Sequence, residues 1–320
     1  TKTIKNGLFL LDSFRQKEVI MFLSDLVDEF LFDCKVRALS ELTVNNYRKQ
    51  LKKFLLYLET AHGVTALEQM RPALIKQYIS FLQGCSLKPA YINDLLKAVK
   101  CLCRYAFDEG YTEGLITERI KNVKQKKVLI HTFSNKEIAG MIKYYSGNNY
   151  LDVRNKLIIM ILFDTGIRVS ELTHMMPEQV KEGYFIIFGK GGKERLVPQN
   201  ASVAKMLIRY RSCRERYFSA RDAQDYLFLS KNGKYLTPEA INKMLKKAAS
   251  DIGVSSSIRV SPHTCRHIFA HQQLKNGLDL YSLSRLLGHE NVSITQRYLE
   301  GIEDTQILNA SRKTGVISNL

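Results

Sequence analysis

The chain has 320 residues, 45% of them hydrophobic, which is enough to bury a core in each of about two domains. Lys and Arg total 48 against 31 acidic residues, so the formal net charge of +17 favours a polyanionic partner, nucleic acid first and an anionic membrane surface second. No run of about 18 apolar residues is present, and the first residues are broken by charge, so we expect neither a membrane span nor a secretory signal.

The first predicted elements are long helices. Through residues 19–36 apolar side chains recur at intervals of three and four, as in a helix that faces a core. A second helix is predicted to begin near Thr43, and another follows Pro89. Residues 16–118 are therefore expected to form an all-helical domain, preceded by a short N-terminal extension of residues 1–15.

Basic side chains mark the outer faces of these helices and the segment that follows them. Residues 119–133 are predicted to link two domains, and their first part, RIKNVKQKK, holds five basic residues and no acid. Lys and Arg near a DNA backbone release counterions, so we expect such residues to contact phosphates; a solvated face without a ligand is the alternative. The candidate DNA-binding residues are Tyr47, Arg48, Lys49, Lys97, Lys100, Lys124, Lys126 and Lys127.

A second domain is predicted for residues 134–300, with a tail at 301–320. Its opening SNKE has the spacing of a capping box, and NKLIIMILFDTG predicts a buried helix that ends at Gly166. YFIIF and KERLVP, joined by GKGG, predict a β-hairpin. Further helices are predicted at 202–219, at 237–252 and from about 262 onward. The expected fold is mainly α with a small antiparallel β-sheet, in two domains.

Four short segments of this second domain carry residues suited to chemistry on phosphate. In TGIRVSEL, a flexible Gly precedes Arg168 and Glu171, which lie three residues apart. In FGKGGKERLVP, a hairpin turn presents Lys190, with Lys193 as the competing lysine. HTCRH places a histidine and an arginine on one helix face, and GHENVSITQRY sets a histidine nine residues before a tyrosine. These last four are His263, Arg266, His289 and Tyr298.

Other chemistries fit these segments poorly. GKGGKE lacks the G-x-x-x-x-G-K-[ST] spacing of a nucleotide-binding loop, and no HExxH is present. None of the six cysteines forms a CxxC pair or a Cys/His quartet with zinc spacing, so we expect no metal and reduced thiols in a cytoplasmic protein. Cys265, inside HTCRH, is expected to pack and not to react.

Taken together and in this order, the segments resemble the tyrosine recombinase family, which includes phage integrases and Xer recombinases. The resemblance implies a catalytic set of Arg168, Lys190, His263, Arg266, His289 and Tyr298, supported by Glu171. It implies a helical core-DNA-binding domain over residues 16–118 and an α+β catalytic domain, which together clamp DNA. It also implies a tail that docks on a neighbouring copy or packs on its own domain.

The residue types suit a cofactor-free phosphoryl transfer. Tyr298 can attack the phosphate and store the bond energy, while Arg168 and Arg266 can each fork two N–H groups onto its oxygens. His289 can donate a further bond, Lys190 can protonate the leaving 5′ oxygen, and His263 can take the tyrosine proton. Glu171 is expected to orient this set of catalytic residues and to do no chemistry itself. No ATP, metal or other cofactor is then needed.

The expected partners are double-stranded recombination sites and other copies of the chain, as a dimer on one site and a tetramer in the synapse, with accessory proteins possible. The biological role could be integration or excision of a mobile element, or resolution of DNA multimers. A type IB topoisomerase-like DNA relaxase would use nearly the same residues as a monomer. A DNA-binding relative that has lost catalysis is the non-enzymatic alternative.

Overall fold

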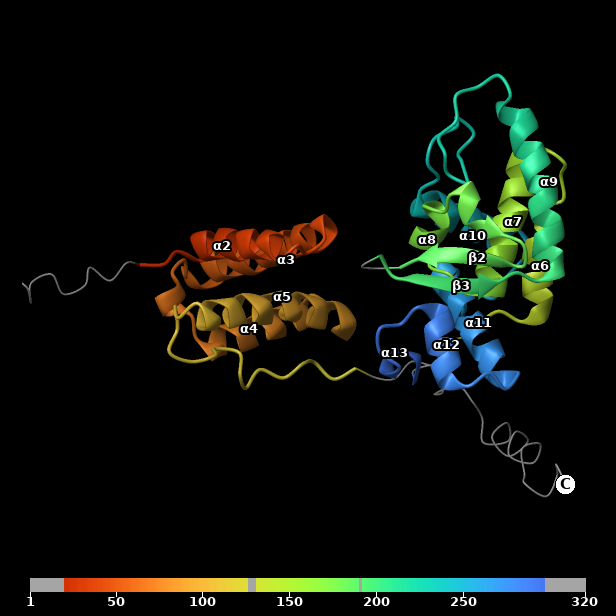
Figure 1. Cartoon of the computed structure of the whole chain (residues 1–320). Helices are drawn as coiled ribbons and strands as arrows, with labels where there is room; N and C mark the ends of the chain where they lie inside the picture. Colours follow the sequence, from red (N-terminus) through yellow and green to blue (C-terminus); the bar gives the residue numbers. More distant parts are fainter. Residues whose placement is uncertain (1–19, 126–130, 190–191, 297–320) are drawn as a thin grey trace, which may run out of the picture. The chain divides into compact units, whose positions relative to one another are not determined.

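The structure, a computed structural model, describes residues 20–125, 131–189 and 192–296 (Figure 1). The chain divides into two compact units, residues 1–127 and 128–320. This division falls inside the predicted linker, and the finer domain bounds stay predictions. Among the described helices, none is both long and apolar enough to cross a membrane.

Residues 20–125 of the first unit form four α-helices, α2 (Leu23–Val36), α3 (Glu41–His62), α4 (Pro72–Gly84) and α5 (Pro89–Asp108). In Figure 1, α2 lies beside α3, and α4 lies beside α5. A short 3₁₀ turn, η2 (Leu67–Gln69), joins α3 to α4. Fully buried apolar side chains from all four helices make one core, among them Leu26, Leu51, Phe54, Ile75, Leu95 and Val99.

Three details of this unit differ from the sequence prediction. The helix predicted over 19–36 begins only at Leu23, because Phe22 instead pairs with Ala66 in an isolated β-bridge and the Leu23 N–H donates to the Thr65 carbonyl. The second helix begins at Glu41, two residues before Thr43, since Ser40 caps it by accepting the Thr43 N–H. Helix α4, opened by Pro72 at its first turn, was not predicted.

The second unit is mostly helical around a small sheet. The sheet order is β1 (Val180–Lys181), β2 (Tyr184–Phe188) and β3 (Glu194–Pro198), all antiparallel, with Phe188 opposite Glu194. The helices in the described part of this unit are α6 (Asn135–Tyr144), α7 (Tyr150–Thr165), α8 (Val169–Thr173), α9 (Ala201–Phe218), α10 (Pro238–Asp251), α11 (Pro262–Lys275), α12 (Leu280–Leu287) and α13 (Ser293–Gln296). The turn η3 (Pro177–Gln179) precedes the sheet.

Local sequence signals explain where these elements begin and end. The predicted capping box is confirmed, since Ser134 accepts the Glu137 N–H while Glu137 accepts the Ser134 N–H. Helix α7 is the predicted buried helix: Leu157, Ile158 and Ile161 are buried, and it ends at Gly166 in a left-handed conformation. The hairpin and the helices from residue 201 onward also form as predicted. The prediction of a mainly α fold with a small antiparallel sheet is confirmed.

Candidate active site

The first part of the site is the sharp turn between α7 and α8. Gly166 has φ +60°, and a side chain there would meet the Phe269 ring at 2.4 Å, so only glycine fits this turn. The chain then places Arg168 as the N-terminal cap residue of α8, with its backbone N–H donating to Glu171 Oε2 at 2.8 Å. The turn therefore fixes Arg168 and Glu171 before any ligand is present.

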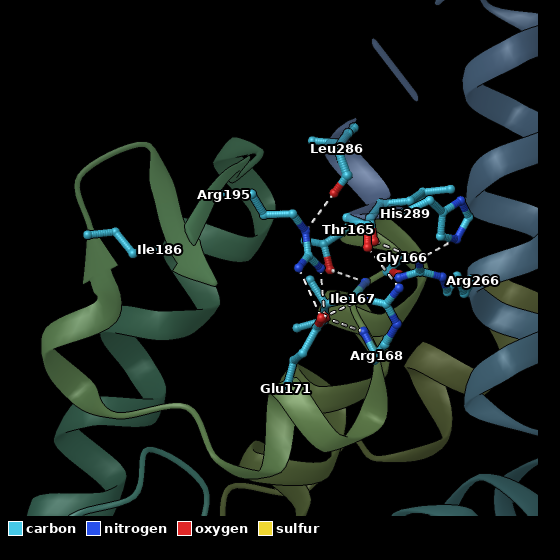
Figure 2. A network of polar contacts seen from close by, with 12 residues as sticks. Thr165, Gly166, Ile167, Arg168, Glu171, Ile186, Arg195, Arg266, Leu286 and His289 are labelled. Atoms are coloured by element: carbon cyan, nitrogen blue, oxygen red, sulfur yellow. Dashed lines mark hydrogen bonds and ion pairs between the residues drawn. The ribbon is translucent and has the colours of Figure 1, made fainter. Parts of the chain in front are cut away.

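Glu171 is a carboxylate held between two arginines (Figure 2). Its Oε1 accepts from Arg168 Nη1 at 2.8 Å and from Arg195 Nη1 at 2.9 Å, and its Oε2 also accepts from Arg195 Nη2 at 2.7 Å. Burial alone would raise the pKa of Glu171, but hydrogen bonds and charge from Arg195, then from Arg168, hold the pKa below its ordinary value. Glu171 is thus an anion at neutral pH.

Arg266 occupies the centre of the site from α11. It is almost completely buried, with Nη1 donating to the Gly166 carbonyl at 2.7 Å and Nη2 to the Leu287 carbonyl at 2.6 Å. Its Nη2 also contacts His289 Nε2 at 2.9 Å. The buried Arg266 guanidinium thus binds both the α7–α8 turn, which carries Arg168, and His289, so the three residues form one cluster (Figure 2).

The C-terminal end of α12 binds three arginines of the site, Arg168, Arg195 and Arg266. The Leu286 carbonyl accepts from Arg195 Nε at 2.8 Å, the Leu287 carbonyl accepts from Arg266, and the Gly288 carbonyl accepts from Arg168 Nη2 at 2.9 Å. The last carbonyls of a helix lack partners within the helix and carry partial negative charge. The end of α12 therefore gathers three cations that would otherwise repel one another.

The contacts of His289 with Arg266 and Thr295 indicate its tautomer. A guanidinium can only donate, so His289 Nε2 accepts from Arg266 and the neutral ring carries its proton on Nδ1. Nδ1 then donates to Thr295 Oγ1, 2.7 Å away. Thr295, on α13, is completely buried, so it holds this ring orientation. Donation from Nε2 to a phosphate, the role expected for His289, requires a proton on Nε2 and a shift of this contact.

An open cleft of about 1190 Å³ lies over the cluster. The cluster holds the three guanidiniums of Arg168, Arg195 and Arg266 and one carboxylate, which two of them bind, so it keeps a net charge of two positive units beside this cleft. Such a site suits an anion with several oxygens, as a phosphodiester has. The lining includes Arg168, Glu171, Lys193, Arg195, Gly288, His289 and Ile294.

The structure brings together some, not all, of the predicted catalytic residues. Arg168, Glu171, Arg266 and His289 meet in one network, whereas Lys190 and Tyr298 lie outside the described residues. His263 is exposed on α11, and its Nε2 contacts the Nε2 of His267 at 3.0 Å. Lys193 is exposed at the cleft. Cys265 is fully buried, and this burial raises the pKa of its thiol, as expected of a packing residue.

The predicted DNA-binding residues of the first unit have varied surroundings. Tyr47 is half-buried: it packs against Phe30 and its hydroxyl contacts Cys101 Sγ at 3.6 Å, and its DNA contact stays a prediction. The Lys100 ammonium donates to Asn122 at 2.9 Å. Arg48, Lys49, Lys97 and Lys124 are exposed, while Lys126 and Lys127 lie outside the described residues. Their DNA contacts stay predictions.

The sequence analysis missed Arg195 and Thr295. A signal for Arg195 existed, because β3 alternates in burial and Arg195 falls on the same face as the buried Val197. An arginine at an inward strand position needs an acidic or carbonyl partner. No comparable local signal marks Thr295. Within residues 20–125, 131–189 and 192–296, no cluster of His, Cys, Asp and Glu has the makings of a metal site.

Replacing Glu171 by Gln should reduce stability at neutral pH. Arg195 and Glu171 are only 10% and 7% exposed, and removing one partner of a buried pair costs about 3 kcal/mol in the free energy of unfolding. Because the folded-state pKa of Glu171 is lowered, this stabilisation is present above its ordinary value of 4.5 and is lost as the pH falls through the lowered value.

Urea unfolding at neutral and acidic pH tests this expectation. The difference between wild type and Glu171→Gln should be full at pH 7 and shrink below pH 4.5. Glu182→Gln, at an exposed position of the β1–β2 turn, is the matched control and should change little. A Glu171→Gln protein as stable as the wild type at pH 7 would contradict the assigned ion pair.

Comparison with known proteins gives a consistent assignment. The sequence pattern of the phage integrase family matches residues 131–303, and that of the phage integrase N-terminal SAM-like domain matches residues 27–110. The tyrosine recombinase XerD of Staphylococcus aureus (strain Mu50) is 31% identical over 280 residues, covering 85% of this chain and 92% of XerD. XerD of Listeria innocua is 28% identical over 86% of this chain and 94% of its own length.

Solved structures share the fold. A XerH site-specific recombinase bound to a palindromic difH substrate, in a post-cleavage complex, has a TM-score of 0.72 and 22% identity, covering 89% of this chain and 84% of that one. A lambda integrase tetramer bound to a Holliday junction has a TM-score of 0.68 and 17% identity, covering 94% of this chain and 87% of that one.

Proposed function

Because the chain belongs to the phage integrase family of tyrosine recombinases, we propose that it cuts and rejoins DNA at specific sites through a covalent 3′-phosphotyrosyl bond to Tyr298. The observation that carries this proposal is the cluster of Arg168, Arg266 and His289 at the end of α12, beside an open cleft. It is a binding site for one phosphate, built before the DNA arrives.

Arg168 and Arg266 would hold that phosphate from different positions in the site. Arg168 is 39% exposed and faces the cleft, whereas Arg266 lies almost completely buried behind it. Each guanidinium carries five N–H donors, so binding a phosphate oxygen does not require Arg168 to leave both Glu171 and Gly288. Preorganised donors of this kind stabilise the charge that develops in the transition state.

The remaining roles belong to residues of the family pattern. Tyr298 attacks the phosphorus and forms the phosphotyrosyl bond while the bond to the 5′ oxygen breaks. Lys190 gives a proton to that oxygen, and His263 takes the proton of the Tyr298 hydroxyl. Attack by a free 5′ hydroxyl then reverses the step and releases Tyr298. No ATP and no metal ion takes part in this proposed reaction.

The proposed partners are two recombination sites and further copies of the chain. Two copies would bind one site and four would hold a synapse and its Holliday junction, with the helical unit and the catalytic unit clamping the duplex. The lambda integrase neighbour is a tetramer on such a junction, which supports this proposal. The role would be integration or excision of a mobile element, or resolution of DNA multimers.

Cleavage can be tested on a DNA site that the protein itself selects. A duplex that the wild-type protein retains from a random-sequence library, nicked at successive positions, should trap a covalent protein–DNA adduct on a denaturing gel. Binding without any adduct would favour a catalytically inactive relative. Relaxation of a supercoiled plasmid by a monomer, without exchange between two selected sites, would favour a topoisomerase-like relaxase.

DNA binding is expected to depend steeply on salt. A net charge of +17 implies many phosphate contacts, and a protein with about 6–10 of them loses about 10³–10⁵ in affinity between 50 and 200 mM salt. A titration of the selected duplex by fluorescence anisotropy measures the slope of log K against log salt. A flat slope would show that the charge serves some other partner.

A further inference from the structure

Arg195 lies inside the polar network, although it is none of the predicted catalytic residues (Figure 2). Its side chain leaves β3 on the inward face and ties three elements together: the hairpin that carries it, Glu171 of α8 and the Leu286 carbonyl of α12. It is only 10% exposed, against 39% for Arg168. Arg195 is therefore placed to hold other groups, whereas Arg168 faces the cleft.

Glu171 has no capacity left once Arg195 is bound. Each of its two oxygens accepts two hydrogen bonds, one from Arg195 and one from Arg168. A carboxylate offers about four such positions. The carboxylate is thus locked in one orientation, and through it the guanidinium of Arg168 is aimed.

The charges show why a second arginine is needed. A carboxylate alone, 2.8 Å from Arg168, would cancel much of the positive charge that a phosphate has to meet. Arg195, at 2.7 Å from the same carboxylate, offsets its negative charge. We propose that Arg195 is a positioning residue of the recombinase site: it holds Glu171 by both oxygens and offsets its charge, so that Glu171 orients Arg168 without neutralising it.

The end of α12 is shaped around the same side chain. Gly288 has φ +66°, and a side chain at this position would lie 2.8 Å from Arg195 Nη1 and 3.1 Å from Arg195 Cδ. The absence of a side chain lets Arg195 cross Gly288, whose own carbonyl binds Arg168. Arg195 therefore lies against both residues that bind Arg168: it donates hydrogen bonds to Glu171 and packs closely beside Gly288.

A pair of variants separates this role from simple packing. Arg195→Gln leaves the charge of Glu171 without its offset, and cleavage of the selected nicked duplex should fall by about 10²-fold, the loss typical of a misplaced catalytic group. Duplex affinity should stay near that of the wild type. Arg195→Gln combined with Glu171→Gln restores the net charge of the cluster and leaves an amide oxygen that can still accept from Arg168, so part of the lost rate should return. Arg216→Gln, at an exposed position of α9, is the charge-matched control and should cleave normally.

The outcomes separate this inference from the proposed function, on which it rests. If the wild type forms no adduct, the proposed function fails and takes the inference with it. If the wild type cleaves and Arg195→Gln cleaves equally fast, the inference alone fails. If the double variant cleaves no faster than Arg195→Gln, the proposal that Arg195 offsets the charge of Glu171 is wrong. This conclusion holds whatever the thermal unfolding temperatures of the two variants.

Discussion

Tyr298→Phe should bind the selected duplex with nearly normal affinity and form no covalent adduct. The substitution removes one hydroxyl, and a single hydrogen bond contributes only about 0.5–1.5 kcal/mol to binding, so the affinity should change by less than about tenfold. The nucleophile itself is lost, so cleavage should fall below detection. Anisotropy measures the binding, and a denaturing gel of nicked duplex measures the adduct.

A second tyrosine makes this test specific. Tyr281, on α12, is 61% exposed, and Tyr281→Phe is the same chemical change away from the proposed nucleophile. It should form the adduct at the wild-type rate. If Tyr298→Phe still links to DNA, another side chain attacks the phosphate and the central claim fails. If Tyr281→Phe alone abolishes the adduct, the nucleophile has been assigned to the wrong tyrosine.

The sequence predicted local structure best where the cause is local. The capping box at Ser134, the left-handed end of α7 at Gly166 and the hairpin of β2 and β3 each follow from a few adjacent residues. The start of α2 was predicted too early because its backbone is taken by Thr65 and Ala66, residues more than forty positions away. Periodicity along one segment cannot reveal such a competitor.

The candidate site shows the same division. Family resemblance selected Arg168, Arg266 and His289, and the structure brings these three together. Family resemblance could not reveal that the end of α12 binds Arg168, Arg195 and Arg266, because backbone carbonyls carry no sequence signature. The partnership of Arg195 with Glu171 joins residues 24 positions apart through tertiary packing alone.

A change of the leaving group tests whether Lys190 is the general acid. If Lys190 protonates the departing 5′ oxygen, Lys190→Ala should slow cleavage by about 10²–10⁴-fold, the range of a general acid. The loss should largely vanish when sulfur replaces the bridging 5′ oxygen, because a thiolate leaves without a proton. Single-turnover cleavage of the two nicked duplexes, one with oxygen and one with sulfur, measures both rates.

Lys193 is the control for this assignment because it is exposed at the cleft from the same hairpin. Lys193→Ala should affect both duplexes alike, and Arg168→Ala should not be rescued by sulfur, since Arg168 holds charge on the non-bridging oxygens. Rescue of Lys193→Ala in place of Lys190→Ala would move the general acid by three residues and leave the family assignment intact. With rescue of neither variant, the proton must come from outside the hairpin, and the role given to its lysines would be wrong.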